Sequence, residues 1–184
     1  MQNLLKFSNK EIFSISLILV LALSRLIPHP PNITPIIAVA IMSSYLFKNI
    51  YLSLITVLVS MLLSDIFIGF YENMIFVYLS LTVITFIFYK VSNKANYKSL
   101  FVFGFFGSLI FYLISNFGVW ILSDMYEKSL GGLAYCYFLA IPFFKNTLMS
   151  TIIFSYIAFF ANSVYEKSFK SSWKSKKYYH DWLQ

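Results

Sequence analysis

The chain has 184 residues, of which 59% are hydrophobic, 21% aromatic and only 11% charged. A soluble domain carries about 25% charged residues, so this composition excludes an ordinary soluble fold and predicts an all-α integral membrane protein. Fourteen basic residues against seven acidic ones give a formal net charge of +7. The single Cys136 cannot form a disulfide within the chain, and no paired-cysteine metal motif is present.

Six apolar segments approach the roughly 20 residues that a helix needs to cross a bilayer. In chain order they are residues 11–28, 33–48, 50–69, 74–91, 99–123 and 144–165. No Ala-x-Ala-like cleavage site follows the first, so we expect it to be retained. Residues 131–143 are too few to cross, and we expect an outer or re-entrant helix broken from the last crossing at Pro142. The prediction is a single six-helix membrane domain, residues 1–165, with a basic, aromatic tail, residues 166–184.

The basic residues orient this bundle. Eleven of the fourteen fall on one predicted side, namely Lys6, Lys10, Lys48, Lys90, Lys94, Lys98, Lys167, Lys170, Lys174, Lys176 and Lys177. The positive-inside rule makes this side cytoplasmic, with both termini, in the cell inner (plasma) membrane. An even number of crossings requires the same arrangement. The lysines and aromatic residues of the tail suit an anionic lipid surface or a docking partner better than a nucleic acid.

Unusual polar residues collect at the opposite, outer ends of the predicted helices. The first connection, Ser24–Pro35, carries Arg25, His29, Asn32 and Thr34 between two apolar segments. Its four prolines restrict the backbone, so we expect a stiff loop. Charged and imidazole groups are costly near hydrocarbon, and such a cluster indicates a functional site.

Asp65 lies near the outer end of the third segment, where a lone carboxylate needs a partner or a proton. Arg25 is its natural partner, and the pair could either tie two helices together or orient a binding site. His29 could be a water-exposed loop residue or a group that hydrogen-bonds a ligand. No second histidine lies near it in the sequence, so we expect no metal.

Asn116 and Trp120 are four residues apart and share one face of the fifth helix. An amide beside an indole can bind a planar ligand, although Asn116 could also cap a neighbouring backbone and Trp120 could be an interface residue. Tyr137 belongs to an aromatic rim with Tyr126 and Tyr135, of a kind common at membrane surfaces. Cys136 is expected to be a small buried hydrophobic residue.

Several catalytic patterns are missing from the sequence. It has no Gly-x-x-x-x-Gly-Lys phosphate loop, no Gly-x-Ser-x-Gly elbow and no His-Glu-x-x-His pair. We therefore expect a protein that is not an enzyme, holds no cofactor and does not itself hydrolyse ATP.

The polar motifs resemble those of a bacterial membrane family of unknown function, DUF6580, from about Ser24 to Asn146. The matching stretches are Arg25–Ala40, Leu63–Tyr71, Ser115–Trp120, Gly131–Tyr137 and Ala140–Phe144. The family is similar to the S-components of energy-coupling-factor (ECF) vitamin transporters, including solitary cobalamin-type S-components. This resemblance implies a six-helix S-component-like fold that binds a vitamin or its precursor near the outer face. It also implies a possible partner, an ECF transmembrane coupling subunit with two ATPases.

The cobalamin branch implies a cysteine on the helix that follows the Ser-Asp motif. This sequence has Tyr78 on that helix and no cysteine there. The difference argues against cobalt–thiolate chemistry and leaves the ligand open.

Two functions from different classes follow. The first is capture of a vitamin or related micronutrient at the outer face for uptake, with a substrate site formed by Arg25, His29, Asn32, Asp65, Tyr71, Asn116, Trp120 and Tyr137. The alternative is a structural scaffold of the cell envelope, in which the same groups only tie loops together. An outer cavity of roughly 300 Å³ or more favours capture, whereas a solidly packed outer face favours scaffolding.

Overall fold

The computed structural model describes residues 8–181, with side chains as far as residue 168. This part of the chain forms six α-helices and two short 3-10 helices, and contains no strand. They are α1 (Asn9–Leu23), η1 (Ser24–Leu26), α2 (Ile36–Phe47), α3 (Ile50–Ile68), α4 (Met74–Val91), η2 (Ser92–Lys94), α5 (Tyr97–Leu122) and α6 (Leu130–Asp181).

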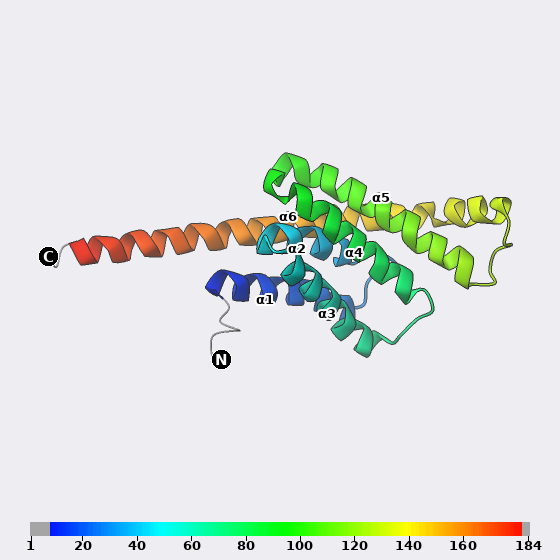
Figure 1. Ribbon diagram of the computed structural model, residues 1–184, viewed down its shortest axis with the longest axis horizontal. Coiled ribbons are helices and arrows are strands. Elements are labelled where there is room, and N and C mark those ends of the chain that lie inside the picture. The colour runs from blue at the N-terminus through cyan, green and yellow to red at the C-terminus, as the bar shows by residue number, and fades with distance from the viewer. Residues whose placement is uncertain (1–7, 182–184) are drawn as a thin grey trace.

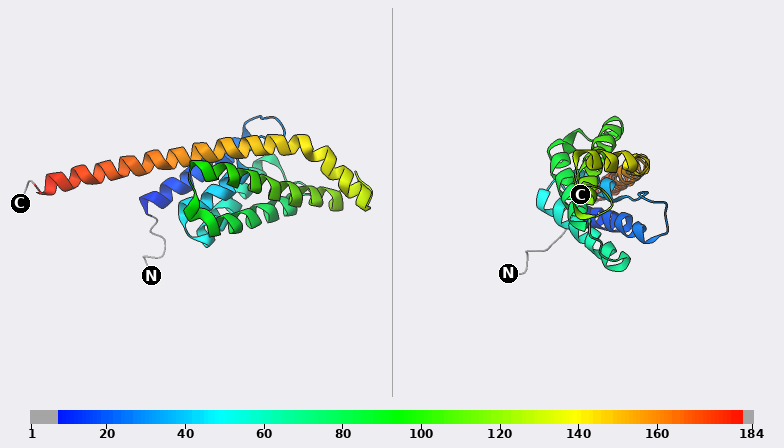
Figure 2. Two further views of the ribbon diagram at one scale, coloured as in Figure 1. Left: turned by 90° about the horizontal axis from the view of Figure 1, so that it is seen from above. Right: turned by 90° about the vertical axis from the view of Figure 1, so that its right-hand side faces the viewer.

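The helices form one bundle in which neighbours along the chain alternate in direction (Figures 1 and 2). The connections at residues 27–35, 69–73 and 123–129 therefore gather at one end, which we call the loop end. The connections at residues 48–49 and 92–96 lie at the other end, which we call the lysine end. Helix α6 projects far past the bundle on the side of the lysine end (Figure 1).

Four helices are long and apolar enough to cross a membrane: Ile50–Ile68, Met74–Lys94, Tyr97–Leu122 and Leu130–Ser168. Their outward faces carry bare apolar side chains, such as Phe67 at 73% exposure and Ile75 at 74%. Contact of such a surface with the hydrocarbon of a bilayer is favourable, whereas its contact with water is not. The chain is therefore a membrane protein, as its composition predicted.

The first two predicted crossings are shorter. Helix α1 has 15 residues and the apolar helix α2 has 12. At 1.5 Å per residue, α2 is about 18 Å long, against a hydrocarbon core of about 30 Å. Six full crossings thus remain a prediction.

Helix α2 is the centre of the bundle. Eleven of its residues are buried, and only Tyr45 is partly exposed. Small residues allow its neighbours to approach, and their hydroxyls make cross-helix hydrogen bonds. Ser44 Oγ donates to the Thr85 carbonyl of α4 at 2.8 Å, and Ser53 Oγ of α3 donates to the Ser43 carbonyl at 3.1 Å. Such bonds stabilise helix contacts where apolar burial gives little driving force.

Helix α6 corrects the sequence prediction for residues 131–143. We expected a separate segment broken at Pro142, but α6 runs continuously through this proline. Proline's fixed φ is compatible with a helix; it removes one backbone hydrogen bond and bends the axis rather than ending it. Figure 2 shows the yellow first part of α6 inclined to the orange remainder.

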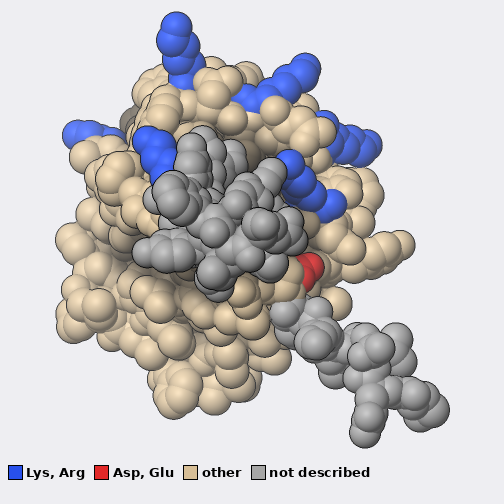
Figure 3. All heavy atoms as spheres, turned by 90° about the vertical axis from the view of Figure 1, so that its left-hand side faces the viewer, with Lys and Arg blue, Asp and Glu red and all other residues tan. Residues whose placement is uncertain are grey.

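The lysine end carries most of the described positive charge. Lys10 lies in the first turn of α1, Lys48 is the C-cap of α2, Lys90 lies in the last turn of α4, Lys94 lies in η2 and Lys98 lies in the first turn of α5. Figure 3 views the molecule from this end and shows lysine and arginine side chains across the upper half of the view. The predicted separation of lysines from the outer loops is thus present in the fold.

The predicted tail begins at residue 166 without a break in the backbone, because α6 continues to Asp181. At the start of the tail, Glu166 Oε1 forms an ion pair with Lys10 Nζ of α1 at 2.6 Å. The tail side chains that carry most of its basic and aromatic character, from residue 169 on, lie outside the described residues.

Candidate functional site

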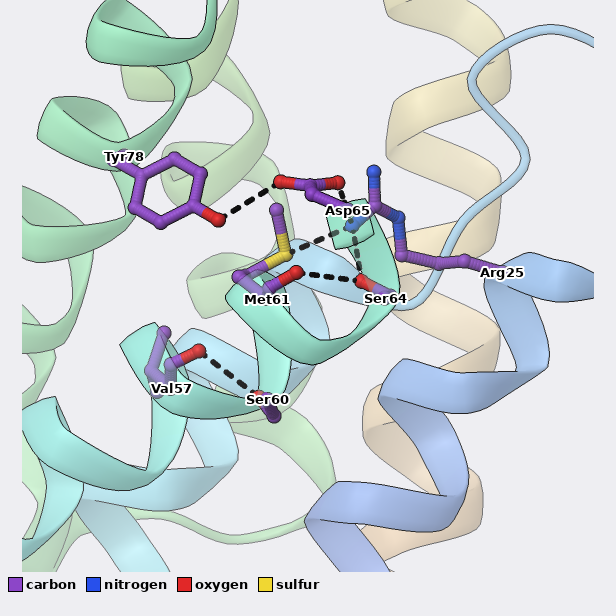
Figure 4. Close-up of polar contacts among 7 residues, drawn as sticks. All are labelled: Arg25, Val57, Ser60, Met61, Ser64, Asp65 and Tyr78. Carbon is purple, nitrogen blue, oxygen red and sulfur yellow. Dashed lines mark hydrogen bonds and ion pairs between the residues drawn. The ribbon is translucent and has the colours of Figure 1, made fainter. Parts of the chain in front are cut away.

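The first polar cluster at the loop end is built around Arg25 and Asp65 (Figure 4). Arg25 Nη1 lies 2.9 Å from Asp65 Oδ1, and the two side chains are 10% and 0% exposed. The same nitrogen donates to Ser64 Oγ at 2.6 Å. The predicted ion pair is therefore present, and it joins η1 to the last turns of α3.

Tyrosines complete this cluster from the side of α4. Tyr78 OH donates to the second Asp65 oxygen, Oδ2, at 2.9 Å. Burial raises the pKa of Tyr71, in the α3–α4 loop, to about 12; the negative charge of Asp65 adds to this effect and Arg25 opposes it. Both carboxylate oxygens of Asp65 are thus engaged by protein groups. The arrangement suits a structural clamp between η1, α3 and α4.

A separate cavity of about 500 Å³ lies at the loop end, and we call it the loop-end cavity. Helix α5 contributes Phe111, Tyr112, Ser115, Asn116 and Val119. Helix α6 contributes Cys136, Leu139, Ala140, Phe143, Phe144 and Thr147. The rest of the lining is Pro31, Asn32, Asn73, Val77, Met125 and Tyr126.

The loop of residues 27–35, which we call the proline loop, forms one wall of this cavity and is held against α6. Asn146 Nδ2 donates to the Pro31 carbonyl at 3.0 Å, and Ser150 Oγ donates to the Asn32 carbonyl at 3.4 Å. Asn32 has φ 61°, a left-handed conformation that asparagine tolerates better than most residues. This turn brings Pro31 and Asn32 to the cavity.

The α5–α6 loop forms another part of the lining and folds back onto the end of α5. Trp120 Nε1 donates to the Glu127 carbonyl at 2.9 Å. Lys128 Nζ donates to the carbonyls of Trp120 and Ser123, which are unpaired groups at a helix C-terminus. These contacts fix the loop that places Met125 and Tyr126 on the cavity.

The eight residues predicted from the sequence do not form one site. Two of them, Asn32 and Asn116, line the loop-end cavity. Arg25, Asp65 and Tyr71 belong instead to the first polar cluster, which we call the ion-pair cluster. His29 is exposed, with Nδ1 3.0 Å from the Pro30 carbonyl.

The remaining two predicted residues, Trp120 and Tyr137, lie beside the cavity and do not line it. Trp120 is bonded to Glu127 as described above. Tyr137 OH donates to the Leu113 carbonyl of α5 at 2.7 Å, and its own carbonyl accepts from Tyr112 OH at 2.5 Å. Their polar atoms therefore tie α5 to α6 and to the loop that joins them.

Sequence reasoning left all six residues of the α6 wall out of the expected site. Cys136, Ala140, Phe143 and Thr147 lie three or four residues apart and so share one helix face. This periodicity was hidden because a break was expected at Pro142. On α5, Tyr112 lies four residues before Asn116 and so shares its face. Phe111, Ser115 and Val119 are also four residues apart and form the neighbouring row of the same wall.

Gly118 lets α4 approach the α5 wall closely. A Cβ atom added there would lie 2.1 Å from Asn73 Oδ1 and 2.4 Å from Phe76 Cγ. Asn73 Nδ2 donates to the Ser115 carbonyl at 3.0 Å, so this glycine protects a contact at the cavity. The absence of a side chain is required here by packing rather than by backbone conformation.

We expect Gly118→Ala to destabilise the protein by about 1–3 kcal/mol, because the added methyl group displaces Asn73 and Phe76. The matched control is Gly104→Ala on the same helix, whose Cβ meets mainly Ile152 Cγ1 at 3.0 Å, a side-chain atom that can move. Both variants share the gain in helix propensity, so the difference isolates the clash. Thermal unfolding in detergent measures it, and equal melting temperatures would contradict the prediction.

Comparison with protein families gives one result. A model described as "Family of unknown function (DUF6580)" matches residues 6–173. Its match extends on both sides of the stretch whose motifs indicated the same family. No curated protein and no solved structure matches the chain.

Proposed function

Because the chain belongs to the DUF6580 family, whose function is unknown, we propose a function from the geometry of its own site. In this proposal, the chain is a membrane-embedded binding protein that captures a vitamin or related micronutrient in the loop-end cavity for uptake. The supporting observation is the cavity itself, about 500 Å³ in volume and lined by both aromatic and amide side chains. Ligand pockets occupy about 300–1,000 Å³ and combine apolar walls with a few polar groups.

The proposed topology places this cavity on the outer face of the plasma membrane. Most of the described lysines lie at the other end of the bundle, and the positive-inside rule makes that end cytoplasmic. Six helices that alternate in direction then put both termini inside. The short α1 and α2 would cross the membrane together with η1 and the proline loop.

Uptake would require a partner that supplies energy, because the sequence has no phosphate-binding loop. An ECF-type transmembrane subunit with two ATPases suits an S-component-like binder with a cytoplasmic lysine end. A scaffold function would need no cavity, and a solidly packed loop end would have favoured it. The capture function is therefore the better supported of the two.

Asn116 provides the direct test. We expect Asn116→Ala to weaken retention of a co-purifying small molecule by about tenfold or more, because a lost hydrogen bond in a desolvated site costs about 1–3 kcal/mol. His29→Ala is the control, since this exposed loop residue does not line the cavity. Native mass spectrometry of the detergent-solubilised proteins measures bound ligand. Absence of any bound metabolite from the unaltered chain, across several growth media, would count against capture.

A further inference from the structure

The loop-end cavity has no charged wall. None of the described residues that line it is an aspartate, glutamate, lysine, arginine or histidine. Two cationic side chains at this end of the bundle have their partners outside the cavity. Arg25 is paired with Asp65, and Lys128 donates to carbonyls at the end of α5. Neither of these two cations therefore lines the cavity.

Three of the four hydroxyl groups of the lining donate their hydrogens to backbone carbonyls, and the fourth, that of Tyr126, is hydrogen-bonded to the Cys136 side chain. Ser115 Oγ donates to Phe111 at 2.6 Å, and Thr147 Oγ1 donates to Phe143 at 2.9 Å. Tyr112 OH donates to Tyr137 in the same way. A hydroxyl has one donor hydrogen and two acceptor lone pairs, so these groups offer a ligand mainly acceptors.

The amide nitrogen of Asn116 also donates to a backbone carbonyl. Its Nδ2 donates to the Tyr112 carbonyl at 2.8 Å, and within the described residues its Oδ1 accepts no hydrogen bond. The aromatic rings of Phe111, Tyr126, Phe143 and Phe144 surround these acceptors. Flat apolar walls with acceptor oxygens fit a ring-shaped molecule that carries N–H or O–H groups.

We propose that the loop-end cavity binds an uncharged, ring-containing molecule that donates hydrogen bonds, and that it rejects anions. The proposal rests on the capture function above and adds the class of substrate. An anionic group inside the cavity would lose its hydration, find no cation and face oxygen lone pairs. A cation would meet aromatic faces and acceptors, but no carboxylate to neutralise it.

Matched probes that differ in charge test the proposal on the unaltered chain. One set is nicotinate, nicotinamide and 1-methylnicotinamide, which are anionic, neutral and cationic. A second set is riboflavin 5′-phosphate with riboflavin, which are anionic and neutral. Binding is measured from ligand-induced shifts in melting temperature and by equilibrium dialysis in detergent. Metabolites released from the purified protein are identified in parallel by mass spectrometry.

We expect the neutral member of any set that binds to bind roughly 100-fold more tightly than its charged counterparts, and the co-purified metabolite to be neutral at pH 7. Equal or tighter binding of a charged member, or a charged co-purified metabolite held in the cavity, would overturn the charge selectivity and leave capture intact. If no probe binds and no metabolite co-purifies, the capture function itself fails.

A gain-of-function variant makes the test sharper. Asn116→Lys adds a cation inside the cavity and should shift the preference toward the anionic member of each set. His29→Lys adds the same charge at the same end of the bundle but outside the cavity, and should leave the preference unchanged. Equal shifts in the two variants would show that the charge of the surface, rather than the cavity, decides selectivity.

Discussion

Arg25→Met should destabilise the protein by about 3–5 kcal/mol, because it leaves the Asp65 carboxylate buried without a cation. Asp65 is fully buried and too short to reach the membrane surface. Its remaining contact is the 2.9 Å hydrogen bond from Tyr78. One neutral donor does not replace the charge of a guanidinium at that depth.

The opposite substitution should cost less. In Asp65→Leu, Arg25 keeps a long side chain at the loop end, and such a side chain can extend to headgroups or water. The double variant Arg25→Met/Asp65→Asn should recover much of the loss, since it removes both charges. We expect the order of stability to be the unaltered chain, then the double variant, then Arg25→Met.

Unfolding in detergent, followed by the melting temperature and by titration with a denaturing detergent, measures this order. Tyr78→Phe is the control for the hydrogen bond alone, and we expect it to cost less than Arg25→Met. If Arg25→Met were as stable as the unaltered chain, the ion pair would contribute nothing to the fold. The same variants should still retain a co-purified ligand once folded, because the ion-pair cluster does not line the cavity.

The helix boundaries could be predicted where a polar residue interrupts an apolar run. Helix α4 begins at Met74 and ends at Val91, as expected, because Asn73 precedes it and Ser92 follows it. The ion pair could also be predicted from the amino-acid sequence alone. Two opposite charges in apolar surroundings have few other ways to be stabilised, so Arg25 and Asp65 could be matched without a structure.

The partner tyrosine could not be predicted in this way. Tyr78 is one of fourteen tyrosines in the chain, and nothing in its local sequence distinguishes it. Its contact with Asp65 depends on how α3 and α4 pack. The same limit applies to Gly118, whose role appears only when Asn73, the residue before α4, lies against it.

The cavity was the least predictable feature, because it is a property of the space between helices. Its walls come from α4, α5, α6 and three loops. The sequence showed polar groups at one end of the bundle, and we expected all of them to share one site. Instead, the strongest charges pair with each other, and weaker amides and hydroxyls border the cavity. Groups that satisfy one another make poor ligand contacts, which explains the division.

Filling the cavity should abolish ligand retention with little effect on the fold. Ala140 is 5% exposed and lies on the α6 wall, two residues before Pro142. In Ala140→Trp, an indole would occupy space that is empty in the free protein. We expect retention of a co-purified molecule to fall by roughly 100-fold, while the melting temperature stays the same or rises because apolar surface is buried.

Ala134→Trp is the matched control, since Ala134 is an exposed residue on the same helix and does not line the cavity. It should retain the ligand as the unaltered chain does. Native mass spectrometry and melting temperature, measured on the same preparations, separate lost binding from lost folding. Retention by Ala140→Trp equal to that of Ala134→Trp would mean that the bound molecule lies elsewhere. The loop-end cavity would then be a packing defect beside the Pro142 bend, because a proline that displaces part of α6 can open space without serving a ligand.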